Sequence, residues 1–293
     1  MSENQSLSDD SSNLTVGEIG FSAEFGSFFE LIIPGLMLSI LGILGLIGNL
    51  ISVFILSRPQ MKGSTNCILI GLASSDSILI LTSILMFGLP ALANHWRTGM
   101  FYYYTTEVFP YITPLIYPVG LIAQSSSVYL TLLVTVERYI AVCSPLTARS
   151  VCTYGRARSC VLLISLAALL YNIPRFLEVT WVSTYDELSR ENRTEVTPTP
   201  LRQNPMYISI YITWLYLVVM YIVPFVSLAL LNLRIYVQIR QSQAERAKLT
   251  RQEQREIGMA TMLLCVVVVF FVCNVLALVV NLLEVSTCLL DEK

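Results

Sequence analysis

The sequence predicts an all-α fold, a polytopic bundle of transmembrane helices, and three observations lead to this fold class. The 293 residues are 55% hydrophobic and only 13% charged, a composition typical of membrane proteins rather than soluble domains. Long apolar runs recur along the chain, and each reaches the ~20 residues that a helix needs to cross a bilayer. These runs do not alternate apolar with polar residues, which argues against a transmembrane β-barrel.

The predicted bundle covers residues 28–285. Its six spans are placed at about 28–57, 66–93, 108–143, 158–178, 206–237 and 257–285. Residues 1–27 are rich in serine and acidic side chains, and they predict a disordered tail. Residues 286–293 form a short segment after the last span. We find no internal repeat in the sequence, which weighs against the inverted-repeat architecture of many transporters.

The distribution of charge orients the spans. Twelve of the 18 lysine and arginine residues lie between spans one and two, three and four, or five and six, or at the adjoining helix ends. Such an excess marks the cytoplasmic side. The Asn-x-Ser/Thr acceptors for glycosylation, Asn4, Asn13 and Asn192, all lie on the other side. The N-terminal tail and residues 286–293 are therefore expected to be extracellular.

Polar side chains occur at membrane depth in spans one to three. Asp76 is a lone acid in span two, and a carboxylate in lipid needs a partner, an ion or a proton. Asn49 follows Gly48 in span one, where an amide can bond to a neighbouring helix. With Asn49 and Ser127 nearby, Asp76 is expected to belong to a functional polar cluster. The alternatives are a protonated structural aspartate and, for Gly48-Asn49, helix packing alone.

Adjacent charges end the third span at Glu137-Arg138-Tyr139. A charge at the bilayer centre costs at least ~2.5–3.5 kcal/mol, so charges within spans are usually functional or close to an interface. Here the two charges can neutralise each other, and the arginine can reach toward water. An ion pair at a helix end, with no role in signalling, is the alternative interpretation.

Other classes of function find little support. The single histidine, His95, and scattered cysteines leave no cluster that could hold a metal. No nucleophile–base pair or phosphate-binding loop is evident, so we expect neither an enzyme nor a bound cofactor. The net charge of −2 gives no support to nucleic-acid binding.

The motifs together resemble those of rhodopsin-like G-protein-coupled receptors. They are Gly48-Asn49, Leu72-Ala73 with Asp76, Glu137-Arg138-Tyr139, Pro145-Leu146 and Pro224, in the family's order and on the expected sides. Within this family, the runs Val134–Cys143 and Cys152–Arg158, with Cys273-Asn274 in span six, are similar to invertebrate FMRFamide-type neuropeptide receptors. The resemblance covers about residues 30–285.

This resemblance implies a plasma-membrane receptor that couples an extracellular peptide to a heterotrimeric G protein. Glu137, Arg138 and Tyr139 would form the switch, with Glu256 as a further partner of the arginine that pins span six in the resting state. Pro224, Phe270 and Asn274 would transmit the signal within spans five and six. Asn49, Asp76 and Ser127 would form the polar cluster in which family members bind an allosteric sodium ion.

The resemblance also implies a pocket for an FMRFamide-like peptide at the outer side. Gly120 stands where amine receptors hold an aspartate, so an amine ligand is not expected. A carboxylate should receive the arginine of such a peptide, with Glu107 and two further acids as candidates. The predicted pocket is lined by Tyr111, Tyr117, Gln124, Ser125, Glu178, Tyr211, Trp214 and Glu284.

Two features depart from the family pattern. The sequence reaches Lys293 without a seventh span, and no cysteine lies at the start of span three or in residues 181–205 to form the usual outer disulfide. One alternative is therefore a truncated, non-signalling receptor fragment or isoform. Another, from a different class, is a six-span ion-coupled transporter or channel with Asp76 as its ion site.

Overall fold

A computed structural model describes residues 26–96, 99–186 and 191–245. Five helices within these residues are long and apolar enough to cross a membrane, and each lies on a predicted span. They are Gly26–Leu56, Ser64–His95, Met100–Cys143, Tyr154–Leu177 and Pro205–Ile239. The third begins at Met100 rather than at the predicted residue 108. Its first turns were not predicted because they are rich in tyrosine and threonine and have low hydropathy. The predicted sixth span, 257–285, lies outside the described residues.

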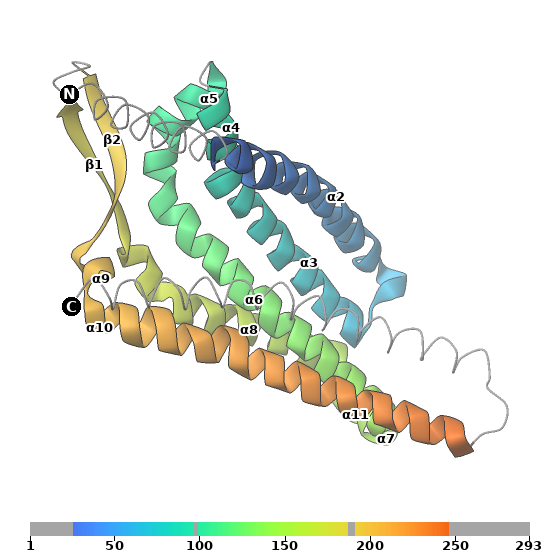
Figure 1. Cartoon of the computed structure of the whole chain (residues 1–293). Coiled ribbons are helices and arrows are strands. Elements are labelled where there is room, and N and C mark those ends of the chain that lie inside the picture. The colour runs from blue at the N-terminus through green and yellow to red at the C-terminus, as the bar shows by residue number, and fades with distance from the viewer. Residues whose placement is uncertain (1–25, 97–98, 187–190, 246–293) are drawn as a thin grey trace, which may run out of the picture.

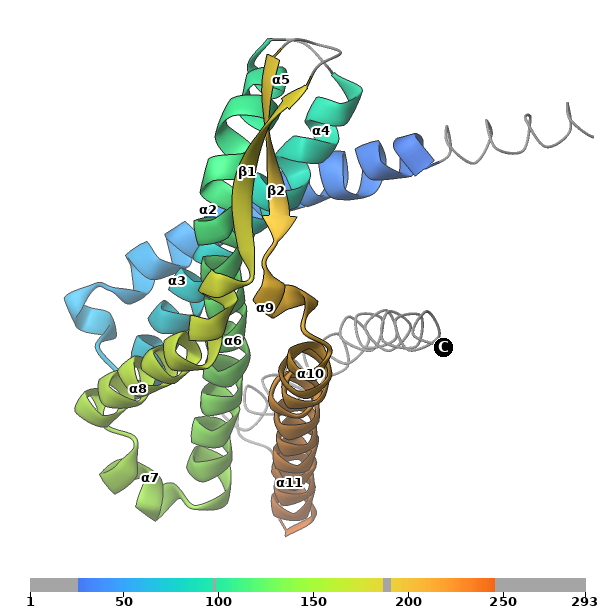
Figure 2. The ribbon, with the colours of Figure 1, turned by 90° about the vertical axis from the view of Figure 1, so that its left-hand side faces the viewer.

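The third span occupies the centre of the bundle (Figures 1 and 2). Its main helix, α6 (Phe109–Cys143), packs against three others: α3 (Ser64–Ser83), α8 (Tyr154–Asn172) and α11 (Val223–Glu245). Helix α2 (Leu38–Leu56) packs on α3 at the edge of the described bundle. A side chain on α6 can therefore contact spans two, four and five.

Several spans change their winding along their length. π-Helical segments occupy Leu31–Met37, Ile84–Gly88, Tyr104–Val108, Ile208–Leu215 and Leu217–Ile222. They join shorter helices, namely α4 (Leu89–His95), α5 (Met100–Tyr103) and α10 (Pro205–Tyr207), to the same spans. Pro224 lies where the last π-helical segment gives way to α11. Its ring nitrogen cannot donate the hydrogen bond that a regular helix needs there.

Short elements complete the connections between spans. The side predicted to be cytoplasmic carries a 3₁₀ turn, Pro59–Met61, and the helix α7 (Pro145–Val151), which begins with the predicted Pro145-Leu146. A 3₁₀ segment, Ile173–Leu177, ends the fourth span, and α9 (Pro200–Gln203) precedes the fifth.

An antiparallel hairpin that the sequence analysis did not predict joins spans four and five. Strand β1 (Val179–Asp186) pairs with β2 (Glu191–Pro198), and Val179 faces Pro198 at the base. β-Branched and aromatic residues dominate β1 and recur in β2, and such residues favour strands. The hairpin lies beside the outer part of the third span, at the end of the bundle where α5 lies (Figure 2).

Packing inside the described bundle is close, whereas its outside is apolar. Ile68, Leu130 and Ala157 form a buried cluster between spans two, three and four. A side chain on Gly71 would meet the Val161 side chain at 2.8 Å, so this glycine lets α3 approach α8. Large apolar side chains such as Phe54 remain exposed, as expected of a surface that contacts lipid.

Candidate functional site

The predicted switch lies at the inner end of α6. Glu137 is 7% exposed, and its Oε2 atom is buried without a hydrogen-bond partner. Arg138 is partly buried, and within the described residues the two side chains form no ion pair with each other. The expected mutual neutralisation is therefore absent from this structure. Glu256, the other predicted partner of Arg138, lies outside the described residues.

The predicted polar cluster is partly assembled. Ser127 on α6 donates a hydrogen bond of 2.5 Å from its Oγ atom to Oδ1 of Asp76 on α3. The structure thus brings together the acid of span two and the hydroxyl of span three. Asn49 on α2 is partly buried, and the described residues give its side chain no hydrogen bond.

A buried ion pair lies at the outer end of the fourth span. Arg175 Nη1 is 3.0 Å from Glu178 Oε1 and 3.3 Å from Oε2, and the two side chains are 4% and 0% exposed. Tyr117 of span three donates its hydroxyl to Glu178 Oε2 at 3.1 Å, and Tyr207 of span five donates to Oε1 at 2.7 Å. Spans three, four and five therefore converge on one carboxylate, and these hydrogen bonds offset the cost of burying its charge.

Aromatic rings extend this network along span five. The guanidinium carbon of Arg175 lies 4.9 Å from the centre of the Tyr211 ring, and Tyr211 stacks on Tyr207 at 5.0 Å. Tyr211 also donates its hydroxyl to the backbone oxygen of Tyr171 on α8. A cation over a ring face is attracted by the π electrons, so Arg175 is held from two directions.

The outer part of α6 contacts the hairpin through Tyr111. The Tyr111 ring packs edge-on against Trp181 of β1 at 5.0 Å, and its hydroxyl lies 3.4 Å from Thr194 Oγ1 of β2. Thr194 also shares a hydrogen bond of 2.8 Å with Ser183 on the opposite strand. Tyr111 thus contacts both strands.

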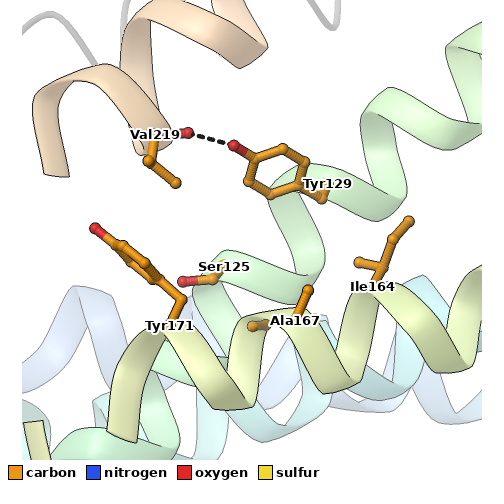
Figure 3. A pocket seen from close by; sticks show the side chains of 7 residues that line it. Ser125, Tyr129, Ile164, Ala167, Tyr171 and Val219 are labelled. Carbon is orange, nitrogen blue, oxygen red and sulfur yellow. Dashed lines mark hydrogen bonds between the residues drawn. The ribbon is translucent and has the colours of Figure 1, made fainter. Parts of the chain in front are cut away.

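A cavity of about 210 Å³ lies between the third, fourth and fifth spans (Figure 3). It is lined by Ser125, Tyr129, Ile164, Ala167, Ala168, Tyr171 and Val219. Asn172 donates to Ser125 Oγ at 3.0 Å, and Tyr129 donates its hydroxyl to the Val219 backbone oxygen at 2.8 Å. Most of the polar groups here are engaged by the protein, although the Tyr171 hydroxyl is buried without a partner.

The residues predicted to bind the ligand lie in different parts of the structure. Tyr117, Glu178 and Tyr211 join the ion-pair network, Tyr111 packs on the hairpin, and Ser125 alone lines the cavity. The described residues give the partly buried Gln124 no hydrogen bond, and Trp214 is 62% exposed and does not line the cavity. Asn192 lies in β2 opposite Tyr185. Five other predicted residues lie outside the described part of the chain: Glu284 of the pocket, Phe270 and Asn274 of the transmission path, and the glycosylation acceptors Asn4 and Asn13.

Two members of the network around Glu178, namely Arg175 and Tyr207, are not among the residues that the sequence analysis predicted for the site. The same holds for Asn172, which donates to Ser125 beside the cavity. A signal was present, because Arg175 and Glu178 are three residues apart at the end of an apolar helix, a spacing that brings opposite charges together. Tyr207 carries no such signal, since its contact with Glu178 spans 29 residues.

Comparison with known proteins supports the predicted resemblance. The model of the 7 transmembrane receptor (rhodopsin family) matches residues 48–292. The chain is 49% identical to the FMRFamide receptor of Drosophila melanogaster over 90% of this chain and 48% of that protein. It is 35% identical to the FMRFamide peptide receptor frpr-18 of Caenorhabditis elegans, over 83% of this chain and 54% of that one.

The probable G-protein coupled receptor frpr-1 of Caenorhabditis elegans is 32% identical over 87% of this chain and 68% of that protein. The chain spans about half the length of the first two relatives. The matched residues include the switch motif, the polar cluster and the outer network. The chain belongs to the rhodopsin family of seven-transmembrane receptors, a family of multi-pass membrane receptors and not of enzymes.

Proposed function

We propose that this protein is a plasma-membrane receptor for an extracellular FMRFamide-like neuropeptide and that it activates a heterotrimeric G protein. The observation that carries the proposal is its 49% identity to the Drosophila FMRFamide receptor over 90% of the chain. The distribution of positive charges and the glycosylation acceptors support an extracellular N-terminal tail. A six-span transporter or channel is not favoured, because the family match explains the same helices and motifs.

The inner switch supports coupling to a G protein. Glu137 and Arg138 are neighbours at the inner end of the central helix, and a buried carboxylate oxygen without a partner is costly. A second packing of the bundle that gives these charges other partners can therefore lie close in free energy to the first. A peptide that binds one packing more tightly would shift the population toward it. Arg138 would then be presented to the G protein as span six moves outward.

The outer acids indicate where the arginine of the peptide binds. Glu178 is fully buried, and its oxygens already accept hydrogen bonds from Arg175, Tyr117 and Tyr207. Glu107 is exposed near the outer end of the third span, and the described residues give it no ion pair. A free carboxylate can bind a guanidinium through two parallel hydrogen bonds. Of the two described candidates, Glu107 is therefore the better site.

Asp76 and Ser127 are suited to bind an allosteric sodium ion. Sodium is a hard cation that prefers oxygen ligands, and these two residues place carboxylate and hydroxyl oxygens 2.5 Å apart between α3 and α6. In this structure the hydroxyl donates to the carboxylate. It would turn its lone pairs to the ion when sodium binds.

Cells that express the protein test this proposal. Calcium and cyclic-AMP responses should be recorded against a panel of peptides ending in Arg-Phe-amide, with surface staining of the N-terminal tail. A response at nanomolar peptide is expected, and the matched free-acid peptide should be weaker. Good surface staining without any response at micromolar peptide would contradict the proposal.

A further inference from the structure

We propose that a buried ionic clamp at Glu178 positions the β1–β2 hairpin over the bundle without any disulfide. Glu178 is then a positioning residue for the extracellular hairpin rather than a contact for the ligand. This inference concerns the protein without any ligand, so it goes beyond the proposed function and can be tested independently of it.

The side chain of Glu178 fixes the clamp to three spans. Its two carboxylate oxygens accept hydrogen bonds from Arg175 of span four, Tyr117 of span three and Tyr207 of span five, at 2.7 to 3.3 Å. Both charged side chains are at least nine-tenths buried. Hydrogen bonds to an ionised group in such surroundings are shorter and stronger than neutral ones. Removing one partner would leave the other charge buried and unpaired.

The backbone around Glu178 closes the base of the hairpin. The Thr199 amide donates to the Glu178 carbonyl oxygen at 2.9 Å, and the Thr199 hydroxyl lies 3.1 Å from the same oxygen and 2.6 Å from the Leu177 oxygen. The first strand pair, Val179 with Pro198, follows directly. The chain therefore enters the hairpin after Glu178 and leaves it at Thr199, and Thr199 is hydrogen-bonded to the Glu178 backbone. Both ends of the hairpin are thus joined to the residue whose side chain is fixed to the bundle.

A covalent tether to the hairpin is ruled out by its sequence. Residues 179–199 contain no cysteine. A second ion pair among the described residues of the hairpin, Arg193 with Glu195, is 72% and 60% exposed, and exposed pairs contribute little to stability. The remaining described anchor is Tyr111, which packs against Trp181. Among the described contacts between the hairpin and the bundle, the polar contacts of the Glu178 side chain are thus the most buried.

Hydrogen–deuterium exchange of the purified protein in lipid nanodiscs tests the clamp. Glu178→Gln keeps the shape of the side chain but removes its charge. We expect exchange in the paired amides of β1 and β2 to rise by about tenfold or more, because each lost charge-assisted bond shifts opening by such a factor. Exchange in α3 and α6 should stay unchanged. The matched control on the same hairpin is Glu195→Gln, which should leave exchange as it is.

Two further variants keep the test decisive if Glu178→Gln does not fold. Tyr207→Phe removes one hydroxyl from the carboxylate and should raise hairpin exchange by several-fold, while Thr199→Val should loosen the base of the hairpin to a similar extent. Wild-type exchange in folded Glu178→Gln and Tyr207→Phe would overturn the proposal.

Discussion

Glu178 illustrates how strongly the surroundings of one side chain decide its role. Its position at the outer end of a span made it a candidate counter-charge for the peptide, as any exposed acid there would be. In the structure Arg175 meets it at 3.0 Å and both are buried. Burying two charges costs several kcal/mol each before their attraction is counted, so this pair requires its tyrosine partners. The sequence shows the charges but not the tyrosine from span five that completes the pair.

Glu107 should therefore matter to the ligand. We expect Glu107→Gln to lower the potency of a peptide ending in Arg-Phe-amide by about tenfold or more, since a hydrogen bond to a charged group contributes ~1.5–3 kcal/mol. The same substitution should not weaken a peptide whose arginine is replaced by citrulline. Concentration–response curves for both peptides measure this, with Glu195→Gln as the control. Equal losses for the two peptides would argue against a contact between Glu107 and the arginine.

Asp76 should make the affinity for the peptide depend on sodium. In the wild-type protein, replacing sodium chloride by choline chloride at equal ionic strength should change peptide affinity, because the ion binds one packing of the bundle better than the other. Asp76→Asn removes the charge and should abolish this difference. Radioligand competition in the two salts measures it. Asn49→Ala serves as the comparison, since the described residues give Asn49 no bond to the cluster, and it should keep its response to sodium.

Helices were easier to predict than the contacts between them. Long apolar runs determine where a chain crosses the bilayer, so all five described spans were found from hydropathy. The outer turns of the third span were missed because Tyr102 to Thr106 are polar enough to read as a loop. The hairpin was missed because strands outside the membrane leave no signal in hydropathy, although Val179 to Tyr185 are mostly residues that favour strands.

The contact between α3 and α8 depends on one glycine. We expect Gly71→Val to lower the stability of the purified protein by about 1–3 kcal/mol, because its Cβ would lie 2.8 Å from Val161 in a closely packed interface. Thermal unfolding in detergent measures the loss. Adding Val161→Ala should restore part of it. Gly48→Val provides the matched control on α2, because a side chain there meets nothing within 4 Å. Equal losses at Gly71 and Gly48 would contradict this account of the interface.

The central helix connects the outer and inner sites of the molecule. Along α6 lie Tyr117 in the outer network, Ser127 in the polar cluster and Glu137-Arg138 at the inner end. Because α6 also packs on spans two, four and five, a change at one end can bias the packing of the whole described bundle. Glu137-Arg138 and the lone Asp76 could be predicted from the sequence, since each lies within one span. Their partners could not, because they come from other spans.

Arg138 is the residue on which the proposed activation of the G protein depends. The measurement that tests it most directly is peptide-stimulated nucleotide exchange on a purified heterotrimeric G protein, comparing the wild-type protein with Arg138→Ala, while binding of the labelled peptide is followed in parallel. We predict stimulated exchange for the wild-type protein, and its loss in Arg138→Ala with peptide binding retained. Undiminished stimulated exchange in Arg138→Ala would contradict the account.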